Sequence, residues 1–382
     1  MTADIPWQSV KNIVLLNLIG NTIGDNLVKI PVIVALKHAY PQARITMTVS
    51  PKNKNAELFT GLKELDELVP VEELVTIGDT NMSRGAKFRR YISLMRTCKK
   101  LLQRVKPEVC FVLEPNFALS QLIPYFAGVP YRVGYTYQGS IFSWTLTHKT
   151  RFRGAHDTNE PQYHVRETNL DILRCVGVPI NPKDKLIHKA VSVESAKWAD
   201  QFFAQHKLDT KKLIVAIQAG AKWIDRAWPT DRFAKIAQHL VKKHHAQIIL
   251  IGSSSEQAIN DQIAAACGKV TLVINESMEH IAALLKKCSF AFGNDSGIMH
   301  LASAVGTTPV VIFGMMCHEH FHPCGPGGYV AIEGPCTPEK PLFVEKTEKV
   351  KESMKLITVE QAITAVDKFL EERTQPVKKR KN

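Results

Sequence analysis

The stretch Ser289-Phe-Ala-Phe-Gly-Asn-Asp-Ser-Gly-Ile-Met-His-Leu-Ala-Ser-Ala-Val-Gly-Thr-Thr-Pro-Val-Val-Ile-Phe-Gly314 has the pattern of a strand, a helix and a second strand. Residues 289–292 predict a short buried strand, followed by a turn. Asp295 and Ser296 are residue types that favour a helix N-cap, and Gly306 is suited to end the helix. A further apolar strand follows over residues 309–313. The pattern therefore predicts a unit of a parallel α/β sheet.

The amino end of this predicted helix is suited to an anion. The first amides of a helix have no acceptor inside it, and the helix dipole is positive at that end. Gly297 lets a ligand approach the backbone, and His300 falls one turn into the helix. These features predict a site for an anion such as a diphosphate. The alternative is an ordinary capped helix, in which Asp295 is only a cap.

Composition indicates a globular protein of 382 residues, long enough for two domains. No apolar run approaches the length that spans a bilayer, and residues 1–10 lack the pattern of a secretory signal. The eight cysteines are scattered, mostly in apolar segments. We therefore expect reduced, buried thiols in a cytoplasmic protein.

The formal net charge of +13 indicates a polyanionic partner. Between Arg84 and Lys106 there are nine basic residues and no acidic one, and a second basic cluster occupies residues 378–381. A helix over residues 87–105 that carries these charges fits three roles: a solvated face, a membrane contact, or a wall for an anionic acceptor. The absence of acidic residues favours a functional role.

Strands and helices alternate along the chain. Strands are predicted over residues 11–19, 43–49, 73–77, 109–113 and 131–134, then over 213–218, 247–251, 271–274, 289–292 and 309–313. A helix from Asp25 to about Tyr40 should be kinked by Pro31. The pattern becomes irregular over residues 139–157, and residues 179–189 read as a linker. This predicts two doubly wound α/β halves, divided as 1–180 and 181–356, with a final helix and basic tail over 357–382.

The block Gly293-Asn-Asp-Ser-Gly-Ile-Met-His-Leu-Ala resembles the signature of glycosyltransferase family 9, the bacterial lipopolysaccharide heptosyltransferases. The resemblance covers most of the chain and is strong around residues 13–50, 216–229 and 289–314. It implies a GT-B fold, with two Rossmann-like domains facing a central cleft. The first would bind the acceptor, and the second would bind the diphosphate of ADP-heptose.

The segment Ile19-Gly-Asn-Thr-Ile-Gly-Asp-Asn-Leu resembles the family's amino-terminal Gly-Asp segment. The resemblance makes Asp25 the catalytic base for the acceptor hydroxyl. The alternative reading is that Asp25 caps its helix. Asn17 stands where a basic residue is common in the family.

The resemblance also implies a set of donor-binding residues. Small residues after the strand at 213–218 would approach the phosphates, and a basic residue before Trp-Pro would pair with them. A carboxylate after the strand at 247–251 would accept the ribose hydroxyls. Without the resemblance, the first segment is an ordinary βα loop with a surface arginine. The carboxylate is then a glutamate at the start of a helix. The predicted donor residues are Gly220, Ala221, Lys222, Arg226, Glu256, Glu276, Met278, Asp295, Ser296, Gly297 and His300, with His300 also assisting catalysis.

The acceptor is expected to meet basic residues of the first half. The predicted contacts are Arg84, Lys87, Arg89, Arg90 and Arg132. Separately, Cys317-His-Glu-His-Phe-His-Pro-Cys324, with Cys336, is rich in soft metal ligands. Its spacing is not a standard zinc pattern, and Ser353-Met354 replaces the Cys-Met of some family members, so no metal and no cofactor are predicted.

The sequence thus predicts an inverting heptosyltransferase at the cytoplasmic face of the inner membrane, with ADP-heptose and an anionic lipopolysaccharide core as partners. Two alternatives stay open. One is a GT-B transferase for another, UDP-linked sugar. The other is a basic nucleic-acid-binding protein, although no nucleic-acid motif is present and no nucleic-acid partner is expected. The choice between Kdo and heptose as acceptor also stays open.

Overall fold

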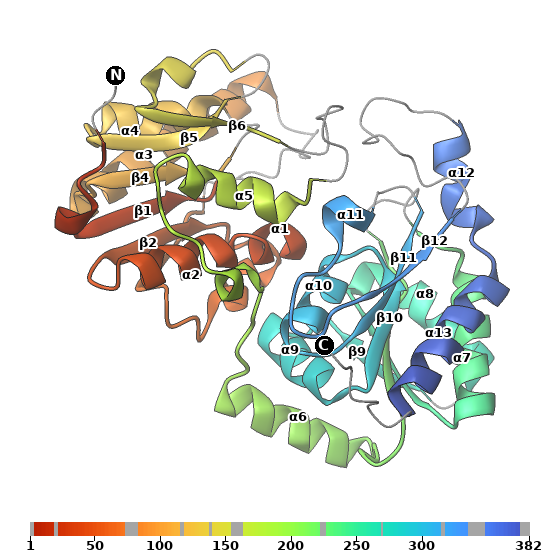
Figure 1. The fold of residues 1–382 in the computed structure, drawn as a ribbon. Coiled ribbons are helices and arrows are strands. Elements are labelled where there is room, and N and C mark those ends of the chain that lie inside the picture. Colours follow the sequence, from red (N-terminus) through yellow and green to blue (C-terminus); the bar gives the residue numbers. More distant parts are fainter. Residues whose placement is uncertain are drawn as a thin grey trace, which may run out of the picture. The chain divides into compact units, whose positions relative to one another are not determined.

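The computed structural model describes residues 4–18, 22–72, 83–114, 118–136, 140–153, 163–221, 227–268, 270–314, 318–334 and 348–374. The chain divides into two compact units (Figure 1). Unit 1 consists of Met1–Gly154 and Tyr163–Ala190, and unit 2 of Ala155–Gln162 and Val191–Asn382. Within the described ranges, every helix is too short or too polar to cross a bilayer.

Unit 1 contains a six-stranded parallel sheet in the order β3-β2-β1-β4-β5-β6. The central strands β1 and β4 are almost wholly buried, as expected for a parallel sheet covered on both faces. The strands are β1 (Asn12–Leu16), β2 (Arg44–Val49), β3 (Glu67–Pro70), β4 (Val109–Val112), β5 (Tyr131–Thr136) and β6 (His148–Arg151).

Helices cover both faces of this sheet. In Figure 1, α2 and α5 lie on one face, and α3 and α4 lie on the other. The helices are α1 (Ile23–Leu27), α2 (Ile30–Ala39), α3 (Arg84–Val105), α4 (Leu122–Phe126) and α5 (Val165–Arg174). Short 3₁₀ turns are η1 (Trp7–Ser9), η2 (Lys52–Phe59), η3 (Ala118–Gln121), η4 (Ser143–Thr145) and η5 (Pro182–Lys185).

Three local predictions for unit 1 differ from the structure. The third strand is β3 at Glu67–Pro70, and the predicted strand at 73–77 lies outside the described residues. The segment predicted as irregular contains β6, an edge strand that is too polar to show a buried pattern. The helix predicted from Asp25 begins at Ile23 and breaks after Leu27, before Pro31. The prediction that this proline disturbs the helix is confirmed.

Unit 2 contains a second six-stranded parallel sheet, in the order β12-β11-β10-β7-β8-β9. Its three central strands are fully buried. The strands are β7 (Ile214–Gln218), β8 (Gln247–Gly252), β9 (Thr271–Ile274), β10 (Phe290–Asn294), β11 (Pro309–Phe313) and β12 (Val330–Glu333). The edge strand β12 was not predicted.

The helices of unit 2 also lie on both sheet faces. α7, α8 and α13 pack together on one face, and α6 and α9 pack on the other (Figure 1). Trp228, Phe233 and Phe292 form an edge-to-face aromatic cluster in the core on the α7 side. The helices are α6 (Val193–Gln205), α7 (Thr230–His244), α8 (Gln257–Cys267), α9 (Met278–Lys287), α10 (Gly297–Ala304), α11 (His318–Phe321), α12 (Glu348–Leu356) and α13 (Val359–Thr374), and η7 is Ser254–Glu256.

Each sheet has one point at which the strand order reverses. In unit 1 it lies between β1 and β4, and in unit 2 it lies between β7 and β10. The loops that leave the two strands at such a point turn to opposite faces of the sheet, so ligands bind at the carboxyl ends of those strands. The fold therefore directs attention to the carboxyl edge of each sheet.

Candidate functional site

In unit 2, three loops meet at the carboxyl edge of the sheet. They follow β7, β8 and β10, strands that are neighbours in the order β10-β7-β8. Gly293 allows β10 to approach β7 closely, because a Cβ at this position would lie 2.6 Å from the carbonyl oxygen of Gln218. The predicted donor residues Gly220, Glu256 and Asp295 all belong to these three loops.

Asn294 holds the β7 loop to the end of β10. Its side chain is fully buried, and its Nδ2 donates hydrogen bonds to the carbonyl oxygens of Ala219 at 2.8 Å and Gly220 at 3.3 Å. Its Oδ1 accepts a hydrogen bond from the backbone amide of Trp228 at 3.0 Å. These partners stand on both sides of residues 222–226. The predicted phosphate ligands Lys222 and Arg226 themselves lie outside the described residues.

The sequence prediction assigned Asn294 only to a turn. In the structure it ends β10, and its amide bonds described residues on both sides of residues 222–226. A buried side-chain amide directly after a buried strand is the signal that could have identified it, because such a group requires several hydrogen-bond partners.

The Glu256 carboxylate closes the start of the helical segment that follows β8. Its Oε2 accepts hydrogen bonds from the amide and the hydroxyl of Ser253, each at 2.7 Å. Its Oε1 accepts one from Nε2 of Gln218 at 3.2 Å. A Cβ on Gly220 would lie 1.4 Å from Oε1, so this position must be glycine for the carboxylate to lie there. Glu256 therefore both caps its turn and lies against the end of β7.

The amino end of α10 contributes the third part of this edge. Ser296 occupies the N-cap position, but its side chain makes no capping hydrogen bond. Asp295 is not the cap, because its backbone amide still donates to the carbonyl of Ile312 in the sheet, at 3.2 Å. Nε2 of the buried His300 lies 4.0 Å from Oδ1 of Asp295. The predicted Asp295, Ser296, Gly297 and His300 are thus together within one turn.

Several buried polar atoms at this edge lack a hydrogen-bond partner among the described residues. They are Oε1 of Gln218, Oγ of Ser296, and both amide atoms of Asn260 on α8. Asn260 is 1% exposed, and its Nδ2 would lie 2.6 Å from a Cβ on Gly252 at the end of β8. Buried polar groups are normally satisfied by protein or ordered water, so their accumulation makes this edge a candidate site for a polar ligand.

The predicted base-pocket residues lie at the end of β9. Met278 is the first residue of α9, and Oε2 of Glu276 lies 2.8 Å from Nδ1 of His280. The His280 ring in turn stacks on Trp198 of α6, with ring centroids 4.0 Å apart. The Glu276 carboxylate is therefore engaged with the α6–α9 pair.

In unit 1, a buried polar network occupies the reversal point between β1 and β4. Nζ of Lys29 lies 2.9 Å from Oε1 of Glu114 and 2.5 Å from Oδ1 of Asn17. Asn17 Nδ2 donates to Oδ1 of Asn26 at 2.9 Å, and Asn26 Nδ2 donates to the Thr22 carbonyl at 2.8 Å. Lys29, Glu114, Asn17 and Asn26 are each at most 6% exposed. The network therefore fixes the turn that begins α1.

Asp25 lies on that turn, and its side chain is exposed. The cap of α1 is Thr22, whose Oγ1 accepts a hydrogen bond from the backbone amide of Asp25 at 3.1 Å. The alternative that Asp25 itself caps the helix is therefore wrong. Its carboxylate stands in the first helical turn, available to a ligand.

The predicted acceptor residues are distributed over two parts of unit 1. α3 begins after the N-cap Ser83, with Arg89 exposed and Arg90 half-buried, whereas the side chains of Arg84 and Lys87 lie outside the described residues. Arg132 is at the start of β5, at the opposite edge of the sheet from Glu114. Its guanidinium donates to the carbonyls of Thr145 and Val129, each at 2.6 Å. This geometry gives Arg132 a role in shaping the sheet and does not support the acceptor prediction.

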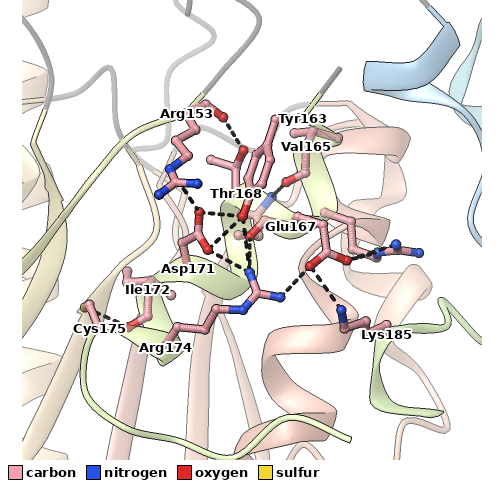
Figure 2. A network of polar contacts seen from close by, with 12 residues as sticks. Arg153, Tyr163, Val165, Glu167, Thr168, Asp171, Ile172, Arg174, Cys175 and Lys185 are labelled. Atoms are coloured by element: carbon pink, nitrogen blue, oxygen red, sulfur yellow. Dashed lines mark hydrogen bonds and ion pairs between the residues drawn. The ribbon is translucent and has the colours of Figure 1, made fainter. Parts of the chain in front are cut away.

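A second network, shown in Figure 2, holds the chain on both sides of residues 154–162. The Tyr163 hydroxyl donates to Asp171 of α5 at 2.9 Å, and the Arg153 guanidinium lies over the Tyr163 ring. Arg174 pairs with both Asp171 and Glu167. Burial and the Asp171 carboxylate raise the pKa of Tyr163 to about 12, so this phenol stays a donor. The network anchors both flanking segments to α5.

Of the cysteine- and histidine-rich segment, Cys317 and Cys336 lie outside the described residues. Cys324 is buried, and its Sγ lies 3.4 Å from Nδ1 of His322. The His318 ring pairs with Glu333 of β12 at 2.5 Å.

Two doubly wound α/β units, each built on a six-stranded parallel sheet, have the architecture of the GT-B class. Residues 96–348, more than half of the chain, match the family model described as glycosyltransferase family 9 (heptosyltransferase). The chain therefore belongs to glycosyltransferase family 9, and it is a glycosyltransferase.

Relatives of known name agree with this assignment. The chain is 24% identical to lipopolysaccharide heptosyltransferase 3 of Escherichia coli strain K12 over 356 residues, which cover 91% of this chain and 96% of the relative. The solved family 9 glycosyl transferase of Veillonella parvula DSM 2008 superposes with a TM-score of 0.74 at 20% identity, over 97% of this chain and 99% of that chain. The E. coli ADP-heptose heptosyltransferase II gives 0.70 at 19% identity, over 96% and 100%. These structures share the fold of this chain.

Proposed function

We propose that this family 9 enzyme transfers heptose from ADP-heptose to an anionic acceptor of the lipopolysaccharide inner core. The proposal depends on one observation at the carboxyl edge of the unit 2 sheet. The hydrogen-bonded Asn294 amide, the Glu256 carboxylate and the amino end of α10 lie on neighbouring loops there. The names of relatives that act on lipopolysaccharide, or that carry ADP-heptose in their name, supply the substrate class.

In this proposal the amino end of α10 binds the diphosphate. The first amides of the helix and the positive end of its dipole stabilise negative charge, and His300 adds a hydrogen-bond donor. Lys222 and Arg226 pair with the same phosphates from the loop that Asn294 positions, next to Gly220 and Ala221. Charge develops on the diphosphate as the sugar leaves, so these groups lower the barrier.

The nucleoside is held at the ends of β8 and β9. Glu256 accepts hydrogen bonds from the ribose hydroxyls, a common role for a carboxylate after a strand of such a sheet. In the structure its oxygens accept hydrogen bonds from Ser253 and Gln218. The ribose hydroxyls would bond the same carboxylate beside these two groups. Glu276 and Met278 line the adenine pocket.

Asp25 of unit 1 acts as the general base. A carboxylate that is exposed and does not cap its helix is free to take the proton of a sugar hydroxyl. The hydroxyl then attacks the anomeric carbon on the face opposite the diphosphate, so that one bond forms as the other breaks. The configuration at that carbon is inverted.

The basic amino-terminal turns of α3 contact the acceptor and the membrane surface that carries it. Arg84, Lys87, Arg89 and Arg90 stand in its first turns, and the helix has no acidic residue. Anionic sugars and phosphates of the acceptor would be attracted to these turns, as would anionic lipids. The enzyme would then act as a peripheral protein on the cytoplasmic face of the inner membrane.

The experiment that tests the proposal compares wild type with Asp25→Asn in an assay of ADP release from ADP-heptose in the presence of an inner-core acceptor. The substitution preserves shape and leaves the Thr22 cap in place, so the Tm should change little. A positioned base contributes about 10²–10⁴-fold, and kcat should fall by that factor while donor affinity persists.

Near-normal turnover by a folded Asp25→Asn enzyme would remove Asp25 as the base. Turnover of a UDP-sugar without turnover of ADP-heptose would instead favour the UDP-linked alternative. Salt-sensitive binding to unrelated DNA, with no sugar transfer, would favour the nucleic-acid alternative.

A further inference from the structure

Three potential metal ligands converge on one another where α7 packs against α13. Nε2 of His239 and Nε2 of His244, both on α7, lie 2.9 Å and 2.7 Å from the same oxygen, Oδ1 of Asp367 on α13. The three atoms all lie within 4.8 Å of one another. Figure 1 shows the two helices side by side on the same face of the unit 2 sheet.

We propose that His239, His244 and Asp367 form a site for a divalent transition metal, with Zn²⁺ as the best match. Two neutral imidazoles and one carboxylate are a ligand set that zinc uses, with water in the remaining position. Each of the three side chains is about one-fifth exposed, which gives a bound ion access to that water. The site is separate from the proposed donor and acceptor contacts.

The distances require only a small adjustment. In a tetrahedral site with metal–ligand bonds of about 2.0–2.2 Å, the ligand atoms are about 3.3–3.6 Å apart. The carboxylate oxygen must therefore move away from each imidazole nitrogen by about 0.4–0.9 Å. Asp367 faces α7 and its side chain is 16% exposed, so the shift has to come from a small rotation of the carboxylate within its rotamer.

The charged neighbour Lys243 affects cation binding in two opposite ways. Nζ of Lys243 lies 2.7 Å from Oδ2 of Asp367, the oxygen that does not face the imidazoles. This contact orients the carboxylate, as outer partners of metal ligands commonly do. Its positive charge also repels an ion, but the Lys243 side chain is more than half exposed and can turn into solvent. Without a metal, the same four groups form an ion-pair cluster, which is the competing explanation.

A metal here would link α13 to α7. The amino end of α7 adjoins the donor loop, since Trp228 just precedes the helix and donates to Asn294. A link between these helices would therefore stabilise the scaffold behind the donor site, without taking part in the chemistry.

The test titrates Zn²⁺ into protein that has been treated with EDTA and dialysed, with calorimetry and Tm as readouts. We expect saturable binding of one ion in the micromolar range and a higher Tm, because the ion binds only the folded state. Since even outer partners of a metal site contribute about 10- to 100-fold, His239→Ala, His244→Ala and Asp367→Asn should each weaken binding at least tenfold. His188→Ala, an exposed histidine of unit 1, is the matched control and should bind as wild type does.

His239→Gln and His244→Gln, which keep a polar side chain of similar reach, serve as replacements if the alanine variants unfold. The absence of saturable binding by wild type would overturn the proposal and leave an ion-pair cluster. One-site binding that persists unchanged in Asp367→Asn would assign the ion to other residues and would overturn it as well. Neither result bears on sugar transfer, which is measured separately.

Discussion

Asn294 bonds three backbone groups from segments on both sides of residues 222–226, so its replacement tests how far this edge depends on one amide. Asn294→Leu would leave the Ala219 carbonyl and the Trp228 amide without their partner, at about 1–3 kcal/mol for each buried group. We expect a lower Tm and at least a tenfold loss of ADP affinity, because the loop bearing Lys222 and Arg226 is released.

The matched control is Asn26→Leu, which removes another fully buried amide, one that bonds Asn17 and the Thr22 carbonyl in unit 1. It should lower Tm to a comparable degree and leave ADP affinity unchanged. An Asn294→Leu protein that melts lower but binds ADP as wild type does would show that this amide supports only the fold.

Gly220 offers a second test at the same scale. An alanine Cβ would occupy the position of Oε1 of Glu256, so the carboxylate must leave the end of β7. If Glu256 binds the ribose, Gly220→Ala should weaken ADP binding by about tenfold, which corresponds to the loss of a hydrogen bond to a charged group. Calorimetry measures this directly.

Gly85→Ala is the control for that variant. A Cβ at Gly85 meets open space within α3, so alanine there should raise stability by about 0.5–1 kcal/mol and leave ADP binding intact. Equal ADP affinity in Gly220→Ala and wild type would separate Glu256 from the nucleotide.

Residue types alone could not decide these roles. Thr22 and Asp25 are both good caps, three positions apart, and only the backbone geometry shows that the threonine caps and the carboxylate stays exposed. The partners of Asn294 are 66 and 75 residues away in sequence. The buried Lys29–Glu114 pair is likewise formed by residues 85 positions apart, and local patterns carry no information about such contacts.

Among the elements, α3 is the helix whose basic residues are proposed to bind the acceptor. It follows β3 and leads into β4, so its first turns are at the carboxyl edge of the unit 1 sheet and its last turns at the opposite edge. Arg89→Glu combined with Arg90→Glu should raise the acceptor KM or loosen membrane association, with ADP affinity unchanged. Acceptor kinetics and vesicle sedimentation measure the two effects.

The same charge reversal at the other end of the helix is the control. Lys99 and Lys100 are exposed and stand about 15 Å further along α3, at 1.5 Å per residue. Lys99→Glu with Lys100→Glu should therefore affect the acceptor less. Equal effects of the two pairs would indicate attraction by total charge, and loss of ADP affinity in either would indicate misfolding.

The elements themselves were predictable where the hydrophobic pattern was strong. Buried strands such as β7 and β11, and the long amphipathic α3, follow the periodicity of the sequence. The edge strand β6 was missed because its sequence His-Lys-Thr-Arg is half-exposed and polar. β12 was missed at an edge of the unit 2 sheet, where little apolar surface is buried. Tertiary pairing with a neighbouring strand decides such segments.

At the scale of the whole molecule, the alternation of strands and helices predicted two parallel α/β halves, and both sheets have that form. The position of each reversal point follows from strand order, which a single sequence does not specify. The resemblance over the Asp295 segment pointed to this edge of unit 2, and its role in donor binding stays a prediction. In the structure, hydrogen-bonded polar side chains and the amino end of α10 are already in place along this edge.

The central claim is that this edge of unit 2 binds ADP. The most direct measurement is a calorimetric titration of the wild-type enzyme with ADP and, separately, with UDP. The account predicts saturable one-site binding of ADP, at least tenfold tighter than that of UDP, since the two share the diphosphate and differ in the base. UDP binding that equals or exceeds ADP binding, or no saturable binding of ADP, would contradict it.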